Sequence, residues 1–123
     1  MTQILVPLAN GFEETEAIAI IDVCRRAGIK VVVAGVDGKI AMGAHDLPVV
    51  TDCLIDEVNT KQLDMIVLPG GWVGTQSLAT NTTVQSILKQ MKQDDKYIGA
   101  ICAAPYALNT ANVLSDNYTC YPS

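Results

Sequence analysis

Residues 97–105 read YIGAICAAP, a strand-like run that ends in a cysteine and turns at once into an Ala/Leu-rich helical stretch. This order of strand, Cys102 and helix is typical of a nucleophile elbow, which holds its central residue in a sparsely populated backbone conformation. The side chain then points over the sheet edge, beside N–H groups and a helix N-terminus that favour thiolate over thiol. We therefore expect Cys102 to be a reactive nucleophile. The alternative is a buried structural thiol, because free cysteine is often buried.

Strand-like and helix-like segments alternate along the chain, both before and after this turn. Continuous apolar runs predict buried strands at residues 3–8, 29–35, 64–68 and 97–101, with a further strand beginning at 118. Apolar periodicity and capping residues predict helices at residues 13–27, from a cap at 80 or 81 through 91, and at 105–113. Less regular segments predict a turn and returning hairpin arm at 37–42, a short strand at 49–50 and a helical turn at 55–58. The alternation predicts an α/β fold, a three-layer α/β/α sandwich around a mostly parallel, flavodoxin-like sheet with a nucleophile elbow.

Composition excludes several classes of protein. The 123 residues fit one domain, and half of them are apolar, which is enough for a core. The net charge of −5 argues against a nucleic-acid partner, since that would need a basic face. No apolar run approaches the ~20 residues that cross a membrane, and the first residues lack the basic region of a signal peptide. A cytoplasmic protein without a membrane partner is expected.

The four cysteines show no metal-binding spacing. They stand at positions 24, 53, 102 and 120, and in a reducing compartment we expect free thiols. Cys24 falls on the apolar face of the first predicted helix. With His45 as the one histidine, expected on a solvated loop, a Cys/His metal site is not predicted. The sequence indicates neither a metal nor a cofactor.

Three features follow strands whose carboxyl ends meet at one edge of a parallel sheet, where ligands bind. They are the acidic residues within 13–16, the Pro-Gly-Gly turn at 69–71 and Cys102. One interpretation is that burial keeps one of the glutamates protonated, so that it donates a hydrogen bond to a thiolate and exchanges a proton with substrate. The alternative is that these carboxylates complement the dipole of the following helix.

The Pro-Gly-Gly turn has two interpretations as well. Its backbone amides, with that of Ala103, would form an oxyanion hole, or it is a plain strand-to-loop turn. It is no phosphate loop, because the Lys and Ser/Thr of that motif are absent. Trp72 lines either the pocket or a subunit contact.

Taken together, these motifs resemble the ThiJ/PfpI superfamily, in its parkinsonism-associated protein deglycase branch. The segments that carry the resemblance are ILV at 4–6, GFEETE at 11–16, RRAGIKV at 25–31, DMIVLPGG at 64–71 and IGAICAAP at 98–105. The resemblance implies that Cys102 is the elbow nucleophile and that Glu16 is the protonated carboxyl bonded to its sulfur. It implies that the backbone amides of Gly71 and Ala103 bind an oxyanion. Tyr121 stands where many members have a histidine, which favours a Cys–Glu pair over a triad.

The resemblance also implies a function. It implies a cofactor-independent, glyoxalase-like enzyme of stress defence, with lyase or hydrolase chemistry. Such an enzyme converts small dicarbonyls, glyoxal or methylglyoxal, to hydroxy acids, or removes glycation adducts. The alternatives are a cysteine-oxidation sensor or chaperone-like protein without turnover and, more weakly, an amidase or peptidase.

Family members are longer than this chain. It resembles their N-terminal two-thirds, so residues 1–123 are expected to form a single domain without its C-terminal segment. That segment would be missing, cleaved or present as a separate chain. Members commonly form homodimers through the first helix, which makes Ala17, Ile18 and Arg26 candidate interface residues.

Overall fold

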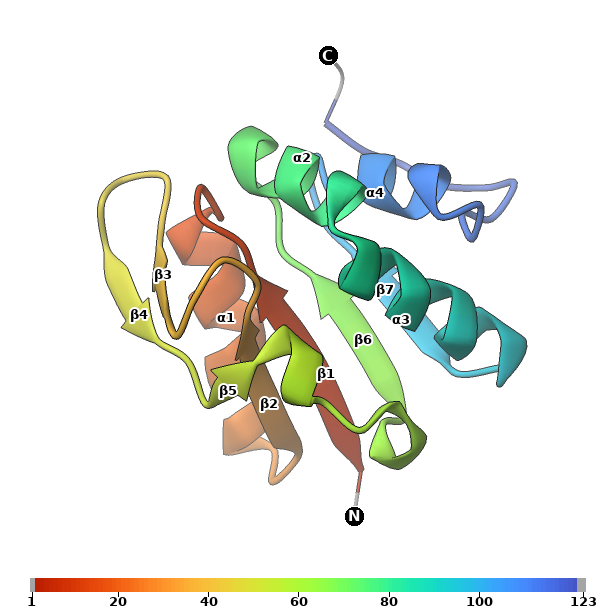
Figure 1. Ribbon diagram of the computed structural model, residues 1–123, viewed down its shortest axis with the longest axis horizontal. Helices are drawn as coiled ribbons and strands as arrows, with labels where there is room; N and C mark the ends of the chain where they lie inside the picture. Colours follow the sequence, from red (N-terminus) through yellow and green to blue (C-terminus); the bar gives the residue numbers. More distant parts are fainter. Residues whose placement is uncertain (1, 122–123) are drawn as a thin grey trace.

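A five-stranded parallel sheet, in the order β5-β2-β1-β6-β7, forms the centre of the molecule (Figure 1). The computed structural model describes residues 2–121. The strands are β1 (Gln3–Leu8), β2 (Lys30–Gly35), β5 (Cys53–Leu54), β6 (Met65–Leu68) and β7 (Tyr97–Ala100). The strand order reverses between β1 and β6, which is where ligands bind in such sheets. The predicted parallel sheet is confirmed, and short β5 is an addition to it.

Helices cover both faces of the sheet. Figure 1 shows α1 (Glu14–Arg26) behind it, and α2 (Trp72–Thr80), α3 (Thr82–Gln93) and α4 (Pro105–Thr110) in front. The molecule has two hydrophobic cores, one on each face of the sheet. Side chains of β1 enter them alternately, because successive residues of a strand face opposite sides. Ile4 and Val6 pack with α1, whereas Leu5 packs with the cluster that includes Leu88 of α3. The three-layer α/β/α sandwich is therefore confirmed.

Local signals set the ends of the two long helices. Glu13 precedes α1 and its side chain accepts a hydrogen bond from the Thr15 N–H at 3.0 Å. Gly28 follows the end of α1 with a φ of 81°, a left-handed conformation that stops the helix. Asn81 caps α3 by accepting from the Val84 N–H at 2.9 Å. The predicted helix at 13–27 and the predicted cap at 81 are thus confirmed.

The segment after β2 differs from the prediction. Residues 37–42 do not return along β2. Instead, β3 (Ile40–Met42) pairs antiparallel with β4 (Pro48–Val50) in a separate two-stranded sheet. Ala41, which is 2% exposed, joins the core beneath α1, and this contact holds the hairpin at that side of the molecule. The short strand at 49–50 is confirmed, and the helical turn at 55–58 is the 3₁₀ turn Ile55–Glu57, followed by an unpredicted turn at Thr60–Gln62.

Two further predictions are corrected towards the C-terminus. The last predicted helix ends at Thr110, because Asn112 turns left-handed with a φ of 60°. Residues 118–121 do not form a strand. Among the described residues, this segment makes one backbone-to-backbone hydrogen bond outside regular structure, from the Tyr121 N–H to the Cys102 carbonyl at 2.7 Å. A single bond does not make a strand pairing.

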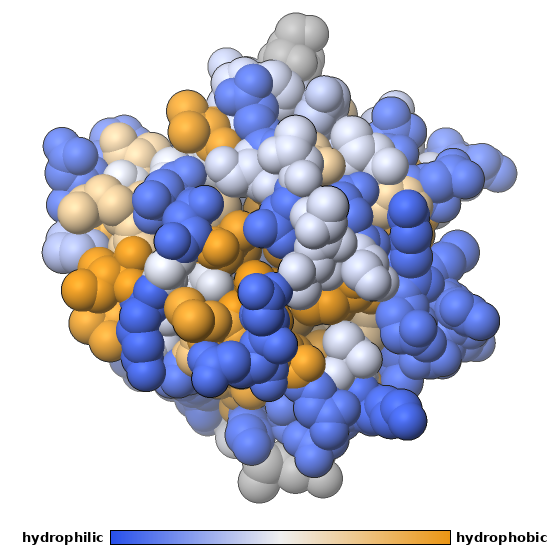
Figure 2. Space-filling model, viewed as in Figure 1, coloured by the Kyte–Doolittle hydropathy of each residue, from blue (hydrophilic) through white to orange (hydrophobic). Residues whose placement is uncertain are grey.

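The surface in Figure 2 is mostly polar on the right, where the end of α3 lies, and carries apolar side chains at its left edge, over β4. Exposed apolar side chains of this hairpin are Ile40, Met42, Leu47 and Val50. Among the described residues, no helix has both the length and the apolar character required to cross a bilayer.

Candidate active site

Cys102 occupies a left-handed turn between β7 and α4. Its φ is 61°, a conformation that costs a residue with a Cβ about 1–2 kcal/mol. Hydrogen bonds hold the turn on both sides: the Ile101 N–H donates to the Leu68 carbonyl at 3.2 Å, and the Tyr121 N–H donates to the Cys102 carbonyl. The backbone therefore has the form of the predicted elbow.

Glu16 and Cys102 meet at Gly70. The Gly70 N–H donates a hydrogen bond to Glu16 Oε1 at 3.0 Å. A Cβ atom at Gly70 would collide with that oxygen and would lie 2.8 Å from the Cβ of Cys102. The ends of β1, β6 and β7 thus bring these three residues together, as their positions in the sequence predict.

The Cys102 thiol has a raised pKa. Burial is the largest cause, followed by the negative charge of Glu16 and a hydrogen bond with it, whereas the Ala103 N–H acts in the opposite direction. This reverses the expectation that the elbow favours the thiolate. Burial disfavours the charged thiolate, and the negative charge of Glu16 repels a second negative charge on the sulfur. Burial and the neighbouring carboxyl group thus oppose the thiolate that the elbow was expected to favour.

The two predicted oxyanion-hole residues, Gly71 and Ala103, follow Gly70 and Cys102 in the sequence. Gly71 follows Gly70 and has a φ of 94°; a Cβ atom there would press on the Gly11 carbonyl and lie 2.7 Å from the Glu13 nitrogen. Among the described residues, the Gly71 N–H donates to no backbone carbonyl outside regular structure. The Ala103 N–H lies close enough to the thiol to lower its pKa, against the larger effects of burial and Glu16. The oxyanion hole stays a prediction.

A cavity of about 450 Å³ opens beside the elbow. Ala103 and Pro105 form its wall on the elbow side. Trp72, from the start of α2, packs edge-to-face against Tyr106 of α4, with ring centroids 5.2 Å apart and an interplanar angle of 68°. Tyr121 also lines this cavity. Trp72 therefore belongs to the pocket, one of the two roles its sequence position allows.

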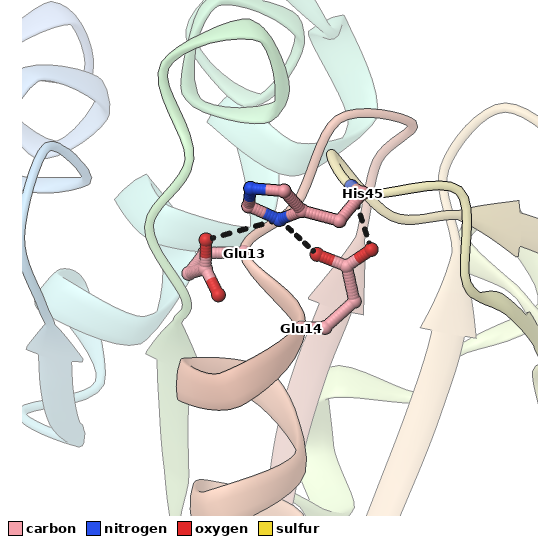
Figure 3. A group of neighbouring side chains, drawn as sticks. All are labelled: Glu13, Glu14 and His45. Atoms are coloured by element: carbon pink, nitrogen blue, oxygen red, sulfur yellow. Dashed lines mark hydrogen bonds and ion pairs between the residues drawn. The ribbon is translucent and has the colours of Figure 1, made fainter.

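The other two glutamates of the acidic segment have separate roles. Figure 3 shows Glu14 reaching His45 on the loop between β3 and β4. Glu14 accepts from the His45 N–H at 2.7 Å and the Leu47 N–H at 3.2 Å, and its Oε1 lies 3.1 Å from His45 Nδ1. Glu13 caps α1 and approaches the same ring nitrogen at 3.6 Å. Glu14 therefore anchors a loop rather than serving the helix dipole.

The contacts between Glu14 and His45 explain why the pKa of each group is shifted. Burial disfavours the Glu14 carboxylate, but hydrogen bonds from its own N–H and from the side chain and backbone of His45 outweigh it, with a further bond from Leu47. Together they lower the pKa of Glu14 to about 2. The hydrogen bond to Glu14, followed by the charges of Glu14 and Glu13, raises the pKa of His45. The loop is thus held by an ion pair as well as by backbone donors.

Glu13, Glu14 and His45 are also residue types that bind metals, and their ligand atoms lie within 4.8 Å of one another. Both Glu14 oxygens, however, already accept hydrogen bonds from the protein. A cation would have to displace these donors and the proton on His45 Nδ1. The geometry favours a hydrogen-bonded anchor over a metal centre.

The remaining cysteines lie outside the Glu16–Cys102 contact. Cys24 is half-buried against the core beneath α1, and Cys53 lies in β5, where burial raises the pKa of its thiol. Cys120 is exposed and lines the cavity beside the elbow. All four are free thiols.

Sequence reasoning missed two contributors to this region. One is helix α2, which presents Trp72 to the cavity; the two glycines before it and Gly74 in its first turn give little helical signal. The other is the anchor between Glu14 and His45, whose partners stand 31 residues apart. The sequence shows Glu14 as one of several acidic residues at the start of a helix, and nothing in it indicates that Glu14 is buried or that His45 is its partner.

The sequence matches a known protein family. A model of the DJ-1/PfpI family matches residues 2–123. Protein DJ-1 homolog B of Arabidopsis thaliana is 43% identical over 104 residues, which cover 84% of this chain and 24% of the plant protein. Glutathione-independent glyoxalase DJR-1.2 of Caenorhabditis elegans is 33% identical over 118 residues, covering 96% of this chain and 62% of the nematode protein.

The fold has a close counterpart among solved structures. Oxidized Toxoplasma gondii DJ-1 superposes with a TM-score of 0.89 at 40% sequence identity, over 93% of this chain and 63% of that one. The chain thus spans about a quarter of the plant relative and less than two thirds of the other two.

Proposed function

Because this chain belongs to the DJ-1/PfpI family, we propose that it supplies the cysteine site of an enzyme acting on small dicarbonyls. In this proposal it converts glyoxal or methylglyoxal to the 2-hydroxy acid with Cys102 as nucleophile and without a cofactor. The similarity to a nematode protein named as a glutathione-independent glyoxalase supports this reaction class.

One observation carries the proposal: the contact of Glu16 and Cys102 across Gly70. A carboxyl group in contact with a thiol offers both groups that a glyoxalase reaction needs, a nucleophile and a proton carrier. Burial and the negative charge of Glu16 raise the pKa of the Cys102 thiol, so the thiolate would form more readily beside a neutral carboxyl group. The reactive form has a neutral Glu16 and a Cys102 thiolate.

The first step is addition. The Cys102 thiolate attacks the aldehyde carbon, a C–S bond forms, and the carbonyl electron pair moves to oxygen to give a hemithioacetal oxyanion. The N–H groups of Gly71 and Ala103 bind this oxygen, and such donors are worth about 10²–10³-fold in rate. Glu16 then supplies the proton that neutralises it.

The second step is an isomerisation. The Glu16 carboxylate removes the hydrogen of the former aldehyde carbon, which gives an enediol, and returns a proton to the adjacent carbon. The product is a thioester of the 2-hydroxy acid. Water cleaves the C–S bond, releases the acid and restores the Cys102–Glu16 pair, so the net reaction adds one water to the dicarbonyl. A positioned acid–base group contributes about 10²–10⁴-fold.

The experiment measures hydroxy-acid formation from methylglyoxal without glutathione or added metal. Cys102→Ala should abolish turnover, and Glu16→Gln should reduce kcat by about 10²–10⁴-fold, because it removes the proton carrier. Cys53→Ala is the matched control, because it removes a thiol at the other edge of the sheet.

Two outcomes would overturn the proposal. Full turnover by Cys102→Ala would exclude the nucleophile, and unchanged turnover by Glu16→Gln would exclude the proton carrier. No turnover by the unmodified chain, with peroxide oxidation of Cys102 to sulfinic acid, would favour the oxidation-sensor alternative.

We further propose that the protein forms a homodimer through α1. Ile18 and Val23 are apolar side chains exposed on this helix, at 41% and 63%. Ala17 is fully buried in the core, so it is removed from the candidate interface residues, whereas Ile18 and Arg26 remain. Light scattering of Ile18→Glu would show a lower mass than the unmodified chain if this face forms the interface.

A further inference from the structure

Aromatic side chains line much of the cavity beside the elbow. The chain contains one Phe, one Trp and four Tyr, and four of these six aromatic residues line this single cavity: Trp72, Tyr106, Tyr118 and Tyr121. Each of them is at least 45% exposed. The aromatic rings therefore gather around an open space rather than in the core, where Phe12 lies.

No charged residue belongs to the described wall. Besides the four aromatic residues, it contains Leu114, Pro105 and Ala103, with Asn109 and Cys120 as further polar members. Aromatic faces and edges bind rings through offset and edge-to-face contacts, as Trp72 and Tyr106 already do with each other. Such a wall selects an uncharged, aromatic or bulky apolar group.

The cavity is also large for a dicarbonyl of a few atoms. Its volume of about 450 Å³ falls in the range of about 300–1,000 Å³ that is typical of sites for much larger ligands. Ala103, whose N–H is a proposed oxyanion donor, forms part of the wall. The cavity therefore begins at the residue that follows Cys102 in the chain.

We propose that this cavity is a subsite for the side chain of the substrate, so that the preferred substrates are 2-oxoaldehydes with an aryl or bulky apolar substituent. The inference rests on the proposed function, because it places the aldehyde at Cys102. The reaction is unchanged in its atoms: an aryl 2-oxoaldehyde takes up one water and becomes the aryl 2-hydroxy acid, with the substituent making no bond.

The test compares phenylglyoxal with methylglyoxal as substrates. Tyr106→Ala removes one ring of the wall and should lower kcat/KM for phenylglyoxal by roughly 2- to 12-fold, the range of an aromatic contact. The kcat/KM for methylglyoxal should stay within about twofold. Tyr106→Phe keeps the ring and should retain the activity on phenylglyoxal. Tyr97→Ala is the matched control, since Tyr97 is 75% exposed and lies outside this cavity.

The outcomes separate this inference from the proposed function. If methylglyoxal turnover depends on Cys102 but Tyr106→Ala lowers both substrates equally, the site is catalytic and the subsite inference is wrong. A selective loss on phenylglyoxal supports it.

A binding measurement covers the case in which no dicarbonyl is turned over. Acetophenone carries the aryl ketone without the aldehyde, and saturation-transfer difference NMR detects weak binding of it. Saturation transfer that disappears in Tyr106→Ala and persists in Tyr97→Ala supports an aryl subsite regardless of turnover. Absence of transfer to acetophenone from the unmodified chain would overturn the inference.

Discussion

The Gly70 N–H donates a 3.0 Å hydrogen bond to Glu16 Oε1, so the loop after β6 fixes the carboxyl group that extends from α1. The same glycine lies against Cys102, because a Cβ added to it would lie 2.8 Å from the cysteine Cβ. One residue without a side chain therefore sets the distance between the proposed nucleophile and its proton carrier.

The first prediction concerns this spacing. Gly70→Ala places a methyl group against Glu16 and Cys102, which must move apart, and a displacement of about 1 Å can cost roughly 10²-fold in rate. We expect kcat for methylglyoxal to fall by about that factor, as measured by hydroxy-acid formation. Gly38→Ala is the control, because nothing lies within 4 Å of a Cβ at Gly38. Equal activity of the two variants would contradict the assignment.

The second prediction concerns strain at the elbow. At the Cys102 φ of 61°, a residue with a Cβ costs about 1–2 kcal/mol more than glycine. Cys102→Gly should therefore be more stable than Cys102→Ala by about 1 kcal/mol in urea unfolding. At Cys53, in β5, the order should reverse, because alanine is favoured over glycine in a strand by about 0.5–1 kcal/mol. Greater stability of Cys102→Ala than of Cys102→Gly would contradict the left-handed turn.

The third prediction tests the cap of α3. Asn81 Oδ1 accepts from the Val84 N–H at 2.9 Å, and replacing such a cap by alanine costs about 0.5–2 kcal/mol. Asn81→Ala should lower the free energy of unfolding by about 1 kcal/mol in urea denaturation. Asn81→Asp, which keeps an acceptor oxygen, should retain the stability. If both variants lose the same free energy, the hydrogen bond is not the cause.

The parallel sheet was predictable because its strands are continuous apolar runs, and a run buried on both faces needs no information from distant residues. The elbow was predictable for a similar local reason, since strand, cysteine and proline follow one another within residues 97–105. Helix α2 was not, because its first turn contains Gly74 and β-branched Val73 and its apolar residues do not follow one clear face. There the tertiary contact decides: Gly74 packs so closely on the loop after β1 that a Cβ would lie 2.9 Å from the Phe12 nitrogen.

The candidate site also has a part that the sequence predicts and a part that it does not. Which residues meet at the sheet edge follows from topology, because Cys102, Gly70 and Glu16 all follow carboxyl ends of parallel strands. The charge state of the thiol does not follow, since it depends on the distance to one carboxyl group and on burial. The sequence indicates a helix N-terminus beside Cys102, but it does not indicate the burial and the nearby Glu16 charge that raise the pKa of the thiol.

The fourth prediction concerns the anchor between α1 and the loop of the β3–β4 hairpin. The Glu14 carboxylate, 3.1 Å from His45 Nδ1, raises the pKa of His45 above 6.5. A raised pKa means that the ion pair stabilises the folded chain fully below pH 6.5, and that this contribution is lost as the pH rises through the pKa of the folded state. The Glu14 contribution has the opposite sign: it is present above about pH 4.5 and is lost as the pH falls towards 2.

NMR can follow this pair directly, because His45 is the one histidine of the chain and its ring protons give a single set of signals. The titration midpoint of these signals should lie above 6.5 in the unmodified chain and should fall towards 6.5 in Glu14→Gln, which removes the hydrogen bond and the nearest charge. Glu13→Gln is the matched control: its carboxylate lies 3.6 Å from the ring nitrogen, and its charge is a smaller cause of the shift, so the midpoint should fall less. A midpoint at or below 6.5 in the unmodified chain would mean that Glu14 holds the loop through the backbone donors of His45 and Leu47 alone.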